Sequence, residues 1–126
     1  MQTIAPGCAL DVERGPDCLF VRVQNLDGPA SETHPLAEHL WQVLQQHFTY
    51  RLVLELNGIR SLSRRLVDQL VELQQRIEQH DGMLRLCGLS PHNRKMLLTH
   101  PAGDRLLPYE DREEAIMGRP HAVKPR

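Results

Sequence analysis

The spacing of hydrophobic positions changes several times along the chain, and each change marks a new element. Residues 18–24 are rich in β-branched and aromatic types and lie between two turn sequences that contain glycine and proline, so they predict a strand. Residues 9–14 alternate apolar and polar positions, and we expect them to pair antiparallel with this strand through the turn at 15–17. The chain therefore opens on a β-hairpin.

A helical spacing begins after Pro35. Large apolar residues recur at three- and four-residue steps as far as Phe48, and Trp41 widens the stripe, which predicts an amphipathic helix. Ser31 or Thr33 is expected to cap its first turn. The next apolar run, residues 51–56, is short and stops at an Asn-Gly pair, as is typical of a central parallel strand covered on both faces.

The longest predicted helix follows this strand. Leucine, valine and isoleucine repeat at helical spacing from Leu62 to Ile77, with Ser61 and Ser63 as alternative N-caps and Gly82 at the expected left-handed cap. Further on, we expect a strand at 83–87, a helix that begins at Ser90-Pro91 and ends before Pro101, and a strand at 106–107. A short helix around 115–116 begins at the capping-box pair Asp111 and Glu114.

Strands that alternate with helices predict the α/β class. We expect one small domain with a mixed, mostly parallel sheet of four to five strands and about four helices, spanning residues 9–116 after an N-terminal extension at 1–8. Residues 117–126 carry three basic residues and no acidic one, and we expect a flexible basic tail. Because only 4% of the 126 residues are aromatic, the core should be aliphatic, with Trp41 and Phe48 on the first helix.

Charge and cysteine content narrow the classes of function. Fifteen Lys and Arg balance sixteen Asp and Glu, so no overall basic field favours nucleic acid. No apolar run approaches the ~20 residues of a membrane span, and no signal peptide is evident, so we expect a cytoplasmic protein. The odd set Cys8, Cys18 and Cys87 has no C-x-x-C spacing, which favours reduced thiols over disulfides.

The usual catalytic patterns do not occur in this sequence. It has no glycine-rich phosphate loop, no catalytic serine or cysteine signature, and no histidine pair at metal-ligand spacing. We therefore expect no enzyme, cofactor or metal, and Glu55, inside an apolar strand, is expected to be paired. Arg60, Arg64 and Arg65 lie at the start of the long helix, a place that favours the binding of an anion. A capped helix with solvated arginines explains the same residues.

The order of several short motifs resembles the STAS family, named for sulfate transporters and anti-sigma-factor antagonists. These motifs are Leu52–Ile59, the long helix, Gly82–Pro91, the Leu-Leu-Pro-Tyr run at 106–109 and the Glu-Glu-Ala-Ile run at 113–116. The resemblance as a whole covers about residues 9 to 116 in order, including the Leu26-Asp27 step after the first strand. The resemblance implies a STAS-like fold and a role as an antagonist of anti-sigma factors.

The resemblance also implies a switch position. In phosphorylatable members, a serine that opens the helix after the central strand is phosphorylated by an anti-sigma factor with kinase activity. Aligning Glu55 and Gly58 with the family pattern places Ser63 at the loop aspartate and Arg64 at the phosphoacceptor serine, with Arg65 at the second serine. Arginine is not a substrate of a serine kinase, and its charge is opposite to that of phosphoserine.

Three hypotheses follow from this resemblance. The first is a non-enzymatic regulator that binds an anti-sigma factor or serine-kinase-type protein through the loop and helix start at 58–69, without the serine switch. The second moves phosphorylation to Ser63 or Ser61, and the third is a sensor of a small anion or nucleotide that uses the same arginines. The residues expected to bind the partner are Asp27, Gly58, Ile59, Arg60, Leu62, Ser63, Arg64, Arg65 and Asp68.

Overall fold

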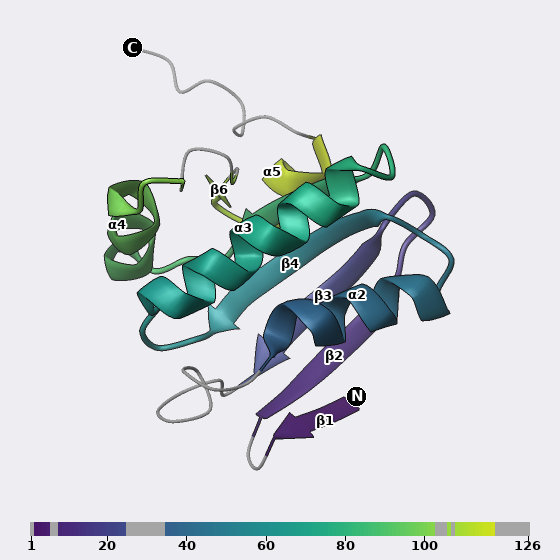
Figure 1. Ribbon diagram of the computed structural model, residues 1–126, viewed down its shortest axis with the longest axis horizontal. Coiled ribbons are helices and arrows are strands. Elements are labelled where there is room, and N and C mark those ends of the chain that lie inside the picture. Colours follow the sequence, from purple (N-terminus) through teal and green to yellow (C-terminus); the bar gives the residue numbers. More distant parts are fainter. Residues whose placement is uncertain (1, 6–7, 25–34, 103–105, 107, 118–126) are drawn as a thin grey trace.

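The computed structural model describes residues 2–5, 8–24, 35–102, 106 and 108–117 (Figure 1). Its strands are β1 (Gln2–Ala5), β2 (Cys8–Arg14), β3 (Leu19–Gln24), β4 (Arg51–Gly58), β5 (Met83–Cys87) and β6 (Pro108–Tyr109). Its helices are α2 (Leu36–Gln46), α3 (Arg64–Glu78), α4 (Pro91–Thr99) and α5 (Arg112–Met117). The candidate caps Ser31 and Thr33 lie outside the described residues. Of the predicted tail at 117–126, Met117 belongs to α5, and the remaining residues lie outside the described part of the chain.

The strands of the described residues form one sheet in sequence order, from β1 to β6. β1, β2 and β3 pair antiparallel, whereas β3, β4, β5 and β6 pair parallel. The predicted hairpin is confirmed, with Val12 opposite Val21. The α/β class and the mixed, mostly parallel sheet are confirmed as well.

Both edges of the sheet differ from the prediction. Gln2–Ala5, within the expected N-terminal extension, pairs with β2 and makes the sheet six-stranded. This segment is too short for a clear apolar alternation, so its backbone pairing could not be seen in the sequence. At the other edge the last strand is Pro108–Tyr109 rather than 106–107, and Leu106 is instead buried in the core.

The main core lies between one face of the sheet and helices α2 and α3, which pack side by side over it (Figure 1). The backbone N–H of Ala37 donates to Gln69 Oε1 at 3.0 Å and so joins the two helices. As expected, almost every large side chain in this core is aliphatic. The fully buried examples include Leu19, Leu40, Leu44, Leu52, Leu54, Leu66 and Leu70.

The end of α2 contradicts the predicted position of Phe48. The helix ends at Gln46, and Phe48 adopts a left-handed φ of 54° with its side chain 91% exposed, so only Trp41 contributes an aromatic ring to this core from the predicted helix. The Thr49 N–H donates to the Leu44 carbonyl at 3.2 Å, which turns the chain away from the helix axis before Phe48 could reach the core.

The end of α3 also differs from the prediction by one residue. Asp81, not Gly82, takes the left-handed conformation, with φ of 57°, while the Gly82 N–H donates to the Ile77 carbonyl at 2.9 Å. Gly82 is needed for a different reason: a β-carbon there would lie 2.2 Å from the carbonyl oxygen of Tyr50.

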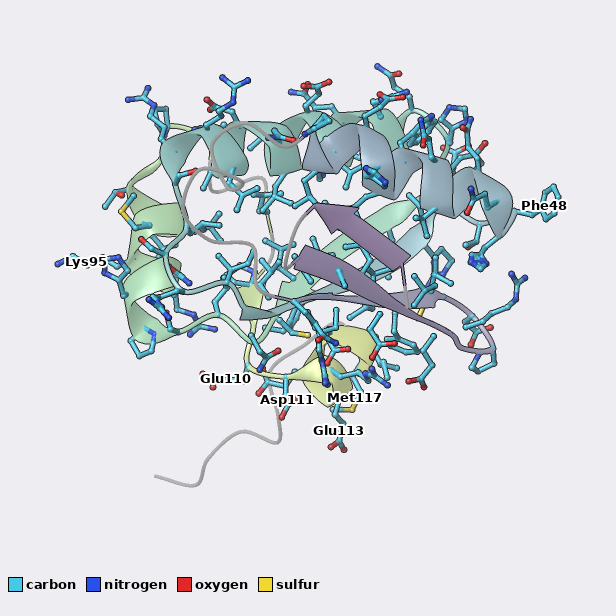
Figure 2. The ribbon with its side chains drawn as sticks, turned by 90° about the horizontal axis from the view of Figure 1, so that it is seen from below. Phe48, Lys95, Glu110, Asp111, Glu113 and Met117 are labelled. Atoms are coloured by element: carbon cyan, nitrogen blue, oxygen red, sulfur yellow. The ribbon has the colours of Figure 1, made fainter. Side chains whose placement is uncertain are left out.

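A smaller cluster lies on the other face of the sheet, where Phe20, Val53 and Cys87 pack with Ala115 of α5. In the view of Figure 2, α5 and the pair α2 and α3 lie on opposite sides of the sheet. The predicted capping box of α5 is present, since the Glu114 N–H donates to Asp111 Oδ1 at 2.9 Å.

Candidate functional site

The loop that connects β4 to α3 forms the centre of the predicted site. It leaves the sheet at Gly58, where a β-carbon would lie 2.2 Å from the Val23 carbonyl oxygen, so β3 and β4 can approach each other only if this residue is glycine. The next residue, Ile59, donates its N–H to the Leu56 carbonyl at 3.1 Å. Gly58 therefore shapes the backbone of the loop.

Asn93 of α4 holds this loop in place, and the sequence analysis did not single it out. Its side chain is completely buried; Oδ1 accepts from the Leu62 N–H at 2.7 Å, and Nδ2 donates to the Ile59 carbonyl at 2.9 Å. One side chain thus satisfies two buried backbone groups, one on each side of the turn at 60–61. A polar residue three positions after the N-cap Ser90 of a short helix gives no signal of this contact.

The predicted partner-binding residues separate into two groups. Ile59 and Leu62 are buried in the core, so their side chains support the loop and supply no exposed contact surface, which corrects that part of the prediction. Gly58 and Ser63 are half-buried between these two groups. The exposed group contains Arg60, Arg64, Arg65 and Asp68, and Ser61, predicted only as a possible phosphorylation site, is exposed as well. Asp27 lies outside the described residues.

The first turn of α3 carries positive charge only. Ser63 is its N-cap, with Oγ accepting from the Leu66 N–H at 3.1 Å, and Ser61 is therefore not the cap. The turn contains no acidic residue, and Arg64 and Arg65 are both exposed. Two guanidinium groups add to the positive end of the helix dipole, so this surface favours a negatively charged partner.

A hollow of about 210 Å³ lies beside Arg64, between the start of α3 and the end of α4. Its other lining residues are Met96, Thr99, His100 and Pro101. Asp68 fixes one wall, because its Oδ1 lies 2.6 Å from His100 Nε2. Arg64 thus borders a partly apolar depression.

Glu55 lies on the other face of the sheet from α3, and its predicted pairing is confirmed. Its carboxylate is 2.6 Å from Arg112 and 3.5 Å from Arg22. Arg112 also contacts Glu13 at 3.2 Å, and the hydrogen bond that Arg112 donates to Glu55 raises the pKa of Arg112. This network holds α5 against the sheet.

The two cysteines whose side chains the structure describes are thiols with raised pKa values. Cys18 and Cys87 are free, and burial raises the pKa of both, to about 12 for Cys87. The side chain of Cys8 lies outside the described part of the chain.

Among the described residues, no group of three His, Cys, Asp or Glu side chains is placed to hold a metal ion. No helix in that part of the chain is long and apolar enough to cross a membrane.

Solved structures with the same fold include regulatory proteins. No protein-family model and no curated protein matches this sequence. The unphosphorylated anti-sigma factor antagonist SpoIIAA superposes with a TM-score of 0.65 at 19% identity, covering 86% of this chain and 93% of that one. A variant of Moorella thermoacetica RsbS gives 0.67 at 12% identity over 86% and 92% of the two chains. The protein TM1081 gives 0.70 at 13% identity over 84% of each.

The order of strands and helices and these superpositions agree with the resemblance found in the sequence, from the hairpin through α5. The chain has the STAS fold, the fold of SpoIIAA and RsbS.

Proposed function

We propose that this chain is a non-enzymatic regulatory protein of the cytoplasm that binds an anti-sigma factor or a serine-kinase-type protein. The binding surface consists of the loop and helix start at 58–69 together with the adjacent hollow, and it operates without phosphorylation at position 64. One neighbour of this fold bears on the proposal: SpoIIAA is an anti-sigma factor antagonist, and its solved form is unphosphorylated.

The observation that carries the proposal is the exposed positive surface at the start of α3. Arg64 and Arg65 project from a first turn without acidic residues, and Arg64 lines the partly apolar hollow. A charged rim around an apolar depression is typical of protein interfaces, in which arginine is enriched. The buried bonds of Asn93 keep the loop backbone in one conformation before a partner arrives, which lowers the entropic cost of binding.

Affinity capture from native cytosol tests this proposal. The wild-type chain and Lys95→Glu, which makes the same charge change on α4 outside the residues that line the hollow, should recover the same regulatory protein. Arg64→Glu should lose it, because an acidic partner would then meet a like charge. Equal recovery by Arg64→Glu, or recovery of no regulatory protein by the wild-type chain, would contradict the proposal.

Phosphorylation at Ser61 is a second candidate, and one observation favours it over Ser63. Ser61 is exposed, whereas the Ser63 hydroxyl is engaged as the N-cap of α3. A phosphate on Ser61 would lie beside the arginines of this surface and reverse its charge. Phosphopeptide mass spectrometry under several growth conditions tests it, and the absence of modified Ser61 in all of them would rule it out.

A further inference from the structure

Phe48 is the most exposed large hydrophobic residue in the part of the chain that the structure describes. Its side chain is 91% exposed, and its φ of 54° lies in the left-handed region that disfavours residues with a bulky side chain. Glycine or asparagine usually occupies this position after a helix. The chain therefore holds an aromatic ring in solvent on an unfavourable backbone, a combination that packing within the monomer does not explain.

The backbone around Phe48 is fixed by hydrogen bonds. Its N–H donates to the Gln45 carbonyl at 3.2 Å, and the guanidinium of Arg14 donates to the His47 carbonyl at 2.7 Å. The ring therefore projects from a rigid turn, as a preorganised contact requires. Figure 2 shows it pointing away from the molecule, at the opposite end from Lys95 of α4.

A hollow of about 110 Å³ lies beside Phe48, between the turn after α2 and the hairpin that joins β2 to β3. Arg14, Pro16 and Asp17 line it. Arg51 adjoins the hairpin, because its Nε donates to the Asp17 carbonyl at 2.9 Å. Neither Arg14 nor Arg51 forms an ion pair with a carboxylate of the described residues; both guanidinium groups donate to backbone carbonyls instead.

We propose that Phe48, Arg14 and Arg51 form a second docking surface, which binds an acidic segment of a partner protein that carries an apolar side chain. The ring supplies apolar contact area, and the two guanidinium groups bind carboxylates beside it. The concave shape favours a protein segment over an anionic membrane, to which one aromatic side chain adds little buried area.

This surface lies at the opposite end of the sheet from the start of α3. Phe48 precedes the first residue of β4, and Arg64 comes after its last. The eight residues of β4 extend about 25 Å at roughly 3.3 Å per residue. The two surfaces are far enough apart for one molecule to bind a partner at each end.

Selection from a phage-displayed library of random dodecapeptides tests the proposal. Selected peptides should contain an aromatic or large aliphatic residue flanked by Asp or Glu. Phe48→Gly should weaken their binding at least about tenfold, as expected for an aromatic anchor. Arg51→Gln should weaken it less and reduce its dependence on salt concentration. Met117→Gln, which removes an exposed apolar side chain on α5, should leave binding unchanged.

The controls distinguish peptide binding at this surface from dimerisation, from membrane binding and from the proposed function at the start of α3. Phe48→Gly should keep a thermal midpoint no lower than wild type, and Arg64→Glu should bind the selected peptides normally even if it fails to bind its own partner. Peptides without acidic residues, or equal binding by Phe48→Gly, would overturn the proposal. So would Phe48-dependent dimerisation in ultracentrifugation, or Phe48-dependent binding to vesicles of phosphatidylcholine and phosphatidylglycerol at 3:1 without peptide binding.

Discussion

Replacing Asn93 by alanine should destabilise the fold by removing the support of the 58–63 loop. The truncation leaves the Leu62 N–H and the Ile59 carbonyl without their partner in a buried site. Each unsatisfied buried group costs about 1–3 kcal/mol, so we expect a loss of about 2–4 kcal/mol after partial relaxation. For a domain of 126 residues, each kcal/mol corresponds to about 4 °C, which predicts a decrease in Tm of about 8–15 °C.

Two measurements check this magnitude and its cause. Thermal denaturation followed by circular dichroism gives the change in Tm, and amide hydrogen exchange gives the protection of the Leu62 N–H. Exchange at Leu62 should accelerate far more than exchange at Leu70, which lies in the middle of α3. A change in Tm below about 3 °C with unchanged exchange at Leu62 would refute the assigned role of Asn93.

Asn93→Asp is the matched variant. It keeps an acceptor for the Leu62 N–H but places a second oxygen against the Ile59 carbonyl, unless the carboxyl is protonated and donates. Burial and this contact should therefore raise the pKa of the new carboxyl in the folded state. Its stability relative to wild type should be highest at acidic pH and should be lost as the pH rises through that raised pKa.

Further predictions concern the left-handed turn at Phe48, the ion pair of Glu55 with Arg112 and the buried thiol of Cys87. Phe48→Gly should raise the free energy of unfolding in urea by about 0.5–1 kcal/mol, because relief of the left-handed backbone strain exceeds the entropic cost of glycine. A net loss of stability would show that the backbone at Phe48 is not strained. Glu55→Gln should lower the free energy of unfolding by about 1–3 kcal/mol, because it weakens a buried ion pair with Arg112. Glu13→Gln changes an exposed partner of the same Arg112 and should cost less than about 0.5 kcal/mol. Equal effects of the two variants would show that burial of Glu55 is unimportant. With the other two cysteines replaced by serine, Cys87 should react with a thiol reagent only on unfolding. The pKa of Cys87 is raised from 9.0 to about 12 on folding, so its contribution to the free energy of unfolding is complete below pH 9 and is lost between pH 9 and 12. A free energy of unfolding that does not fall over this range would contradict the shift.

The amino-acid sequence by itself determined the elements whose signal is local. The hairpin at 9–24, the long helix after the central strand and the strand at 83–87 each depend on periodicity and turn residues within a few positions, and the structure confirms them. The sequence left Ser61 and Ser63 as alternative caps of the long helix, and the structure shows that Ser63 is the cap. The capping box of Asp111 and Glu114 is equally local. The order of the motifs resembles the STAS family, and that resemblance implied the fold that the superpositions show.

Tertiary structure alone decided the features that depend on distant backbone. Gln2–Ala5 became a strand because β2 offers it an unpaired edge, and Phe48 was excluded from the core because the chain turns after Gln46 to reach β4. Asn93 became the support of a loop more than thirty residues earlier in the chain. Hydrogen bonds and burial join residues by proximity in space, and a periodic pattern along the chain carries no record of that proximity.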